Sequence, residues 1–384
     1  MQRTAPDFLF LFLTLLFTAF GLVMVLSASH VIAYREYGDA TYFLKRQAMW
    51  AALGIVFMIV TMNLNGRMLK KLTPFLLLAA FLMLFTVYLP GLGVEAYGSL
   101  RWVRIAGFRL QPGEVIKPAL ILYIASLLEK KGETIRHFKR GLLPPLLVTT
   151  LLVLPVVLQR DLGTAMIALM TVMVMLFVGG ARLLHMLLLG LGTMLFAGLF
   201  ILMFSYRLKR ISAFLDPWQD PLAGGYQLIQ SLYAIAHGGL YGSGLQSIQQ
   251  YFYLPFPYND FIFAIIAEQL GFIGAGAFIL LYALWIVRGI IISVRSGDFY
   301  SQLIGVGSIS AIAIQALVNM GAVTGLMPIT GVTLPLISYG GSSMIITFFL
   351  SGLILGVSRT QRNDQKKSLP PLDPISHQRK AFFS

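Results

Sequence analysis

Two carboxylates at the start of one apolar segment are the residues best suited to chemistry. Asp260 ends a long connection, and Glu268 follows eight residues later inside apolar sequence. On a helix, eight residues advance about 12 Å and turn by about 80°, so both side chains can face one cavity. Ionisable groups in membrane segments are costly, which makes both carboxylates functional candidates by default. For Asp260 the alternative is a helix N-cap, because Asn and Asp cap helices well.

Further ionisable residues lie in two shorter segments. Glu114 and Lys117 are three residues apart, about one helical turn, where an apolar run begins. We interpret them as a self-neutralising pair at a membrane entrance, in preference to direct catalysis. Asp161 stands in a tight turn between two apolar runs, where an Asx cap is the simpler explanation.

Cations and one broken apolar segment complete the candidate site. The segment 331–343, which contains Ser338 and Ser342, is too broken for a helix. Non-helical backbone at membrane depth is tolerated where protein or a watery cavity covers it. Cations near these candidate residues in the predicted topology could bind a phosphate, although each cation considered alone is better explained as an interfacial anchor. They are Arg101, Arg104, Arg109, Arg207, Lys209 and Arg210.

The elements that position these residues must be membrane helices. The chain has 384 residues, of which 57% are apolar and 11% are charged, and its mean hydropathy is +0.80. A soluble domain carries about 25% charged residues, so this chain lacks the polar surface to face water. Because there is no cysteine, disulfides and thiolate chemistry are excluded. Lys and Arg in cytoplasmic loops explain the formal charge of +14, and we expect no nucleic-acid partner.

Apolar runs long enough for a bilayer core of about 30 Å predict an all-α polytopic membrane protein with about ten transmembrane helices. Lys and Arg outside these spans divide 18 to 10 in favour of the side that holds both termini. This bias predicts cytoplasmic termini and candidate residues at the outer surface. We expect a membrane domain, 1–358, a disordered basic tail, 359–384, and long outer connections at 90–114 and 206–259. The predicted spans are 8–26, 48–64, 72–89, 115–128, 142–158, 162–180, 186–205, 261–287, 302–320 and 343–357.

With these motifs the sequence resembles the SEDS family (shape, elongation, division and sporulation) from Asp7 to Arg359. Within the family it is more similar to the FtsW and SpoVE branch than to the RodA branch. The matching stretches include Arg101-Trp102, Gln111-Pro112 with Glu114 and Lys117, Asp161-Leu162-Gly163-Thr164, Pro217-Trp218, Asp260-Phe261-Ile262-Phe263-Ala264, Glu268, the run from Gly325 to Gly331, and Leu334-Pro335 through Ser343.

The resemblance implies a peptidoglycan glycosyltransferase of the bacterial cytoplasmic membrane. Such an enzyme polymerises lipid II, a disaccharide-pentapeptide on undecaprenyl pyrophosphate, into undecaprenyl-linked glycan at the outer face. The implied partners are a class B penicillin-binding protein and other cell-division or elongation membrane proteins. Asp260 matches the family's catalytic carboxylate. For substrate binding we expect Arg101, Glu114, Lys117, Asp161, Arg207, Arg210, Glu268, Ser338 and Ser342.

The chemistry of glycosyl transfer is consistent with these residues. A base must deprotonate the acceptor hydroxyl, and positive charge or a metal must stabilise the departing pyrophosphate. A divalent cation, Mg²⁺ or Mn²⁺, is compatible with this chemistry, but no motif requires it and we assign no metal ligands. The sequence departs from the family pattern at Arg160, where Pro is common, and at Asn259, where Thr is common. Two alternatives stay open: a lipid II flippase, and a non-catalytic scaffold for the penicillin-binding protein.

Overall fold

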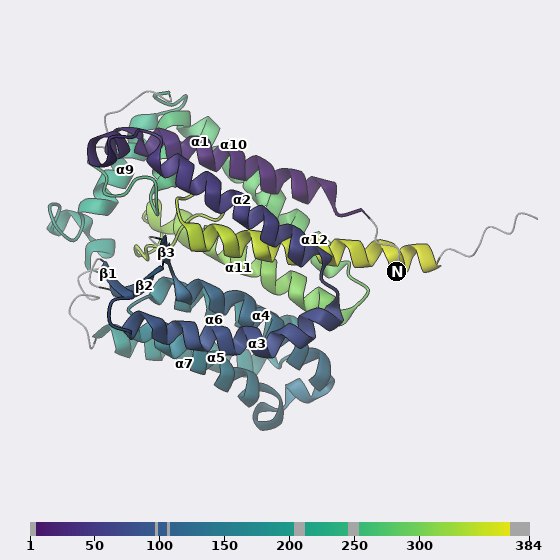
Figure 1. The fold of residues 1–384 in the computed structure, drawn as a ribbon. Coiled ribbons are helices and arrows are strands. Elements are labelled where there is room, and N and C mark those ends of the chain that lie inside the picture. The colour runs from purple at the N-terminus through teal and green to yellow at the C-terminus, as the bar shows by residue number, and fades with distance from the viewer. Residues whose placement is uncertain (1–4, 97–98, 106–107, 203–211, 245–252, 369–384) are drawn as a thin grey trace, which may run out of the picture.

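The fold is a bundle of helices, seen in a computed structural model that describes residues 5–96, 99–105, 108–202, 212–244 and 253–368 (Figure 1). Asp7 caps the first helix by accepting a hydrogen bond from the backbone N–H of Phe10. The helices are α1 (Phe8–Tyr37), α2 (Tyr42–Asn63), α3 (Gly66–Phe85), α4 (Pro112–Lys131), α5 (Leu143–Leu158), α6 (Leu162–Val178), α7 (Leu183–Leu202), α9 (Tyr226–Gly238), α10 (Ile262–Val294), α11 (Phe299–Val323) and α12 (Gly341–Ser368).

Each of the ten predicted spans overlaps one of these helices. By length and composition, seven helical segments in the described part of the chain could cross a membrane. Helix α6 and the segment Leu183–Leu195 of α7 are shorter apolar helices, and α4 carries Glu114 and Lys117 in its first two turns. The chain is therefore a mostly helical membrane protein, whereas the count of ten spans stays a prediction. Helix α12 continues to Ser368, beyond the predicted domain boundary at Arg359.

Aromatic packing between α1 and α10 forms part of the core. Phe17 of α1 packs against Tyr282 and Trp285 of α10, and all three side chains are almost fully buried. Trp285 donates a hydrogen bond to the hydroxyl of Thr14 at 2.9 Å, so the indole N–H keeps a partner in the apolar interior. Tyr282 donates to the backbone carbonyl of Pro335 at 3.0 Å. Helix α10 thereby fixes the non-helical segment between α11 and α12.

Glycines bring α2 and α12 into close contact. A Cβ at Gly54 would lie 2.3 Å from the ring of Phe348, and one at Gly352 would lie 2.0 Å from the hydroxyl of Thr61. Small residues at such crossings let helix backbones approach, which is the usual way that helices pack within membranes. This contact positions the start of α12 beside the candidate site.

A small antiparallel sheet occupies the connection 90–114, which we did not predict from the sequence. Its strands are β1 (Gly93–Ala96), β2 (Ser99–Ile105) and β3 (Phe108–Leu110), in the order β1-β2-β3. Val103 of β2 is buried, and Arg101 lies two residues before it on the same face. In Figure 1 the sheet and α9 lie at one end of the bundle, and α12 ends at the other. The sheet therefore carries Arg101 to a defined end of the bundle.

The long connection 206–259 contains a helix instead of an extended loop. Helix α9 packs on α10, where Gly271 interrupts α10 with a φ of 67°. A Cβ at Gly271 would lie 2.2 Å from the backbone nitrogen of Gly242, so only glycine permits this approach. The backbone N–H of Phe272 donates to the carbonyl of Gly239 at 2.8 Å. The connection is thus attached to the helix that begins directly after Asp260.

Candidate active site

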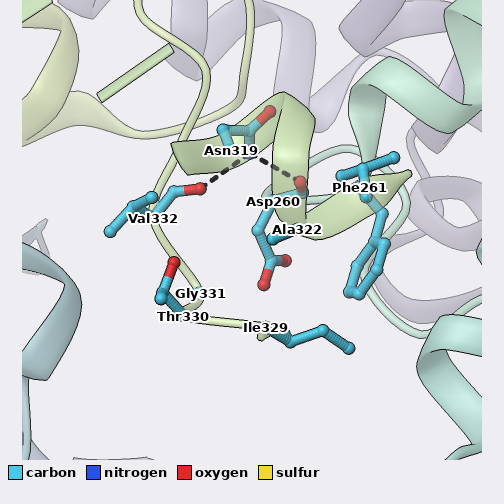
Figure 2. Close-up of a pocket in the computed structure, with 9 residues that line it drawn as sticks. Asp260, Phe261, Asn319, Ala322, Ile329, Thr330, Gly331 and Val332 are labelled. Atoms are coloured by element: carbon cyan, nitrogen blue, oxygen red, sulfur yellow. Dashed lines mark hydrogen bonds between the residues drawn. The ribbon is translucent and has the colours of Figure 1, made fainter. Parts of the chain in front are cut away.

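A small pocket lies at the start of α10 (Figure 2), and Arg101 of the sheet lies near its residue Gly331. Its volume of about 10 Å³ is enough for about one water molecule. A sugar must therefore lie over the pocket instead of inside it in this conformation. The lining residues are Asp260, Phe261, Asn319, Ala322, Val323, Ile329, Thr330, Gly331 and Val332.

Asp260 is the only Asp or Glu among these lining residues. Helix α10 begins at Ile262 with Phe261 in the N-cap position, so the N-cap interpretation of Asp260 is wrong. Asn319 of α11 donates hydrogen bonds to the backbone carbonyls of Asp260 at 2.7 Å and Val332 at 2.8 Å (Figure 2). One buried amide thereby ties the backbone of Asp260 to the broken segment.

Arg101 of β2 lies close to one of the lining residues, Gly331. A Cβ at Gly331 would lie 3.6 Å from Nη2 of Arg101 and 3.6 Å from Oδ2 of Asp260. The φ of Gly331 is 70°, a conformation that favours glycine. A guanidinium and a carboxylate thus lie next to one glycine, where the guanidinium can hold an anionic group beside the carboxylate.

Asp161 holds Arg101 from behind the pocket. Its carboxylate lies 3.5 Å from Nη1 of Arg101 and accepts a hydrogen bond from the side chain of Gln111 at 2.5 Å. The carboxylate also caps α6 by accepting from the backbone N–H of Thr164 at 3.3 Å, which confirms the predicted cap. The backbone N–H of Gln111 donates to the hydroxyl of Ser342 at 2.9 Å. Asp161 is almost fully buried, so it acts on Arg101 from inside the protein.

Glu114 and Lys117 form the predicted ion pair on α4. Their charged atoms are 2.6 Å apart, and both residues are at most 5% exposed. Lys117 also donates to the side-chain carbonyl of Gln315 on α11 at 2.7 Å. Gln315 in turn donates to the backbone carbonyl of Thr333 at 2.9 Å and to the hydroxyl of Ser343 at 3.0 Å. This network joins α4, α11, α12 and the broken segment.

Two further predicted residues, Ser338 and Glu268, are not among the residues that line the pocket. The hydroxyl of Ser338 accepts from the backbone N–H of Leu334 at 2.8 Å, and its carbonyl accepts from the side chain of Gln47 at 2.9 Å. Glu268 is buried on α10 and is not among the residues that line the pocket. Arg207 and Arg210 lie outside the described residues.

Three amide side chains organise the site and were absent from the candidates. Gln111, Gln315 and Asn319 carry most of its hydrogen bonds, and the last two are four residues apart on α11. A search limited to ionisable groups passes over amides. The signal that could have found them is two amides at helical spacing in an otherwise apolar segment, because each must find a partner there.

No metal centre is built from the protein's own side chains in the described part of the chain. It contains no group of three or more His, Asp or Glu residues that could hold a metal ion. A Mg²⁺ ion is commonly held by one or two carboxylates together with the phosphates of a substrate. Asp260 could supply one such carboxylate ligand.

Comparisons with known proteins agree with this architecture. The family model for cell cycle proteins of the FtsW, RodA and SpoVE type matches residues 7–363. Stage V sporulation protein E of Bacillus subtilis (strain 168) is 44% identical over 94% of this chain and 99% of that protein. The probable peptidoglycan glycosyltransferase FtsW of Geobacter sp. (strain M18) is 39% identical over 93% of this chain and 97% of that protein.

The fold is similar to that of a solved structure. The solved structure is that of a peptidoglycan synthase complex that coordinates polymerization and crosslinking. One of its chains superposes on this chain with a TM-score of 0.77. The two chains are 32% identical, and the match covers 93% of this chain and 98% of that chain. Sequence and fold agree over almost the whole length, and the chain belongs to the FtsW, RodA and SpoVE family of cell cycle proteins.

Proposed function

We propose that this protein is a peptidoglycan glycosyltransferase that polymerises lipid II into glycan strands, with Asp260 as the general base. The observation that carries the proposal is that Asp260 and Arg101 both lie next to the Cβ position of Gly331, at the small pocket. The names of the relatives support the reaction class, since FtsW proteins of similar length are named probable peptidoglycan glycosyltransferases.

The proposed step is a displacement at the anomeric carbon of the donor sugar. Asp260 takes the proton of the acceptor 4-hydroxyl while that oxygen forms a bond to the anomeric carbon. The bond between the anomeric carbon and the pyrophosphate oxygen breaks, and undecaprenyl pyrophosphate leaves with the electron pair. A guanidinium near the leaving group stabilises the charge that develops on it.

Arg101 is the described cation that we assign to this pyrophosphate. Its ion pair with buried Asp161 orients the guanidinium towards the pocket without placing a second carboxylate at the surface. We assign Arg207 and Arg210 a supporting role towards the same lipid-linked anion, based on their position in the sequence. For Glu268, Ser338 and Ser342 we propose support of the site's walls.

Glu114 and Lys117 serve this site by positioning. Their pair is buried, and the hydrogen bonds of Gln315 connect it to Thr333 and Ser343 beside the pocket. A buried polar network of this kind helps to hold a non-helical segment in one conformation. We therefore assign the pair the role of holding the broken segment in its position next to Asp260.

The proposed setting is the bacterial cytoplasmic membrane, with ten spans, both termini in the cytoplasm and the active site on the outer side. The charge bias of the sequence supports this orientation. A class B penicillin-binding protein is the proposed partner, because a related chain occurs in a peptidoglycan synthase complex. Other division or elongation membrane proteins would join the same assembly. A divalent cation, Mg²⁺ or Mn²⁺, would bind only together with substrate phosphates, and the proposed step does not pass through it.

The test is a polymerisation assay with purified protein, the class B partner and fluorescent lipid II. A ladder of glycan products supports the proposal. Movement of the fluorescent lipid across a liposome bilayer without polymer would identify a flippase instead. Partner binding with neither activity would leave only the scaffold, and either of these last two results rejects the glycosyltransferase.

A further inference from the structure

A second, larger pocket lies at the opposite end of the bundle. It has a volume of about 350 Å³ and is formed by the loop between α4 and α5 together with the start of α7. Helix α4 begins beside Gln111 in the active-site region and ends at Lys131. Twenty helical residues span about 30 Å, so this pocket lies about one bilayer core away from Asp260.

Cations dominate the lining of this second pocket. Arg136, Lys139 and Arg140 come from the loop, and Arg182 comes from the residue before α7. No Asp or Glu belongs to its lining in the described part of the chain. The positive N-terminal end of the α7 macrodipole adds to the same field, because α7 begins directly after Arg182. The pocket therefore favours a ligand with negative charge.

The loop that presents these cations is packed in place. Ile135 and Leu142 are at most 1% exposed and anchor it on the bundle. A Cβ at Gly141 would lie 2.4 Å from the carbonyl of Thr134, so two turns of the loop touch there. Lys131 donates a hydrogen bond to the backbone carbonyl of Arg140. A loop held at these points keeps the neighbouring cations close to one cavity.

One histidine adds a hydrogen-bonding group to the wall. The ring of His185 lies edge-on to that of Phe138, with ring centres 5.7 Å apart. Its Nδ1 atom is enclosed, and it has no hydrogen-bond partner among the residues that the structure describes. A buried polar atom without a partner is unusual in a native protein and marks a place where a ligand atom can bind.

Exposed leucines next to the pocket indicate where the ligand comes from. Leu184 and Leu188 of α7 are 65% and 58% exposed, and Leu147 of α5 is 60% exposed. Acyl chains can cover such side chains while a headgroup enters the basic pocket. Basic pockets beside transmembrane helices commonly bind the headgroups of anionic lipids.

We infer that this pocket is a binding site for the phosphate headgroup of an anionic phospholipid, in the leaflet opposite to the active site. The guanidinium groups of Arg140 and Arg182 approach from two different segments and can each form paired hydrogen bonds with phosphate oxygens. An ordinary topological signal needs only positive charge near a helix end and does not need charges around a cavity. The convergence of these cations therefore indicates a ligand.

The test compares two double variants that remove the same charge. The double variant Arg140→Gln with Arg182→Gln removes one guanidinium group from each of the two segments that form the pocket. The control is Arg67→Gln with Lys71→Gln, two exposed cations on α3 near the same end of the bundle, where Lys70 pairs with Glu129. All four side chains are exposed, so we expect both variants to fold, and size-exclusion chromatography checks this.

Binding is measured by native mass spectrometry, with titrations of phosphatidylglycerol and of phosphatidylcholine. We expect phosphatidylglycerol to bind the unaltered protein in preference to phosphatidylcholine. The pocket variant should weaken this binding about tenfold or more, since it loses bonds to two guanidinium groups, whereas the control should change it little. Equal losses in both variants would show unspecific surface attraction and overturn the proposal.

A third titration distinguishes the two sources of phosphate. Inorganic pyrophosphate is added to the protein that carries phosphatidylglycerol. Retention of the lipid supports the lipid site. Pyrophosphate that displaces the lipid, and that binds the lipid-free protein more tightly, would reject the lipid as the ligand. All of these readouts measure binding, so a failure of the proposed polymerase activity would leave this result unaffected.

Discussion

Arg101 and Asp260 both lie next to Gly331: Nη2 of Arg101 and Oδ2 of Asp260 are each 3.6 Å from the position that a Cβ would occupy there. The two residues are 159 positions apart, and they come from β2 and from the start of α10. Opposite charges at the edge of one small pocket let a single site hold an anionic leaving group and a base. The absence of a side chain at position 331 keeps the space between them open.

Gly331→Ala tests this relationship with a single methyl group. The φ of 70° makes alanine unfavourable there by about 1–2 kcal/mol, so some loss of thermal stability is expected. Gly91→Ala is the matched control, because Gly91 has a φ of 80° and nothing within 4 Å of its Cβ position. We expect similar stability losses in both variants and a loss of glycan polymerisation only for Gly331→Ala. Equal activity of the two variants would reject the role of this space.

Asp260→Asn should abolish polymerisation and preserve the fold. The substitution keeps the side-chain volume, and the hydrogen bond of Asn319 to the backbone of residue 260 does not depend on the carboxylate. Loss of a general base lowers a rate by about 10²–10⁴-fold. The measurement is the rate of glycan formation from lipid II, normalised to folded protein. Polymer at the unaltered rate would remove Asp260 from the proposed role.

Asp39→Asn is the control for the lost charge. Asp39 lies between α1 and α2, and its hydrogen bonds to the side chain of Lys45 and to Thr41 lower its pKa to about 2. A carboxyl with this pKa is ionised at neutral pH, so its replacement also removes one negative charge. Polymerisation by this variant should match that of the unaltered protein.

The sequence predicted the helices of the bundle better than it predicted the connections. Long apolar runs identify membrane helices because the bilayer fixes their length, and each predicted run coincides with a helix. The sheet around Arg101 and helix α9 escaped prediction. Short strands and an isolated helix depend on packing against the rest of the protein, and their local pattern is weak.

The sequence predicted the charged residues of the candidate site, but it did not predict the amide side chains. Asp260, Asp161, Glu114 and Lys117 stood out because ionisable groups are costly in apolar sequence. The local pair of Glu114 and Lys117 was predicted. The other contacts could not be predicted, because they depend on how distant elements fold together. For example, the side chain of Gln315 accepts a hydrogen bond from Lys117, which is 198 positions away in the sequence. The amide nitrogen of Gln315 donates to Ser343 at the end of the broken segment.

Lys117→Met should destabilise the protein strongly. The substitution leaves Glu114 buried without its partner 2.6 Å away, and loss of one member of a buried pair costs about 3–5 kcal/mol. The control is Lys45→Met, which breaks a pair of similar length, 2.8 Å, whose side chains are 70% and 40% exposed. Exposed pairs contribute little, so its melting temperature should stay close to that of the unaltered protein.

A double variant distinguishes the effect of an unpaired buried charge from the effect of losing the hydrogen-bond network. Glu114→Gln with Lys117→Met leaves no buried charge and should recover much of the stability that Lys117→Met loses. Exchange of the two residues should recover less, because a carboxylate at position 117 would meet the carbonyl oxygen of Gln315. The measurement is the fraction of monodisperse protein after heating in detergent. If Lys117→Met and a single Glu114→Gln variant both melt like the unaltered protein, the pair has no structural role.

Arg101→Gln should raise the concentration of lipid II needed for half-maximal polymerisation. The guanidinium beside Asp260 is the described cation that we assign to the pyrophosphate, and glutamine keeps a polar side chain without the charge. Arg104→Gln is the matched control, since Arg104 lies on the same strand and is exposed, on the opposite face of β2. The rate is measured against lipid II concentration for both variants.

The same titration extends to Arg210→Gln, the cation proposed from sequence alone. A headgroup anchor is individually dispensable, because an exposed cation contributes about 1 kcal/mol to attraction by an anionic surface. A ligand of the pyrophosphate should instead shift the curve to higher lipid II while membrane insertion and partner binding stay unchanged. A shifted curve for Arg101→Gln and unchanged curves for Arg104→Gln and Arg210→Gln would restrict the pyrophosphate site to the strand that faces Asp260. An unchanged curve for Arg101→Gln would instead remove this arginine from the substrate site and leave its ion pair with Asp161 as a structural contact.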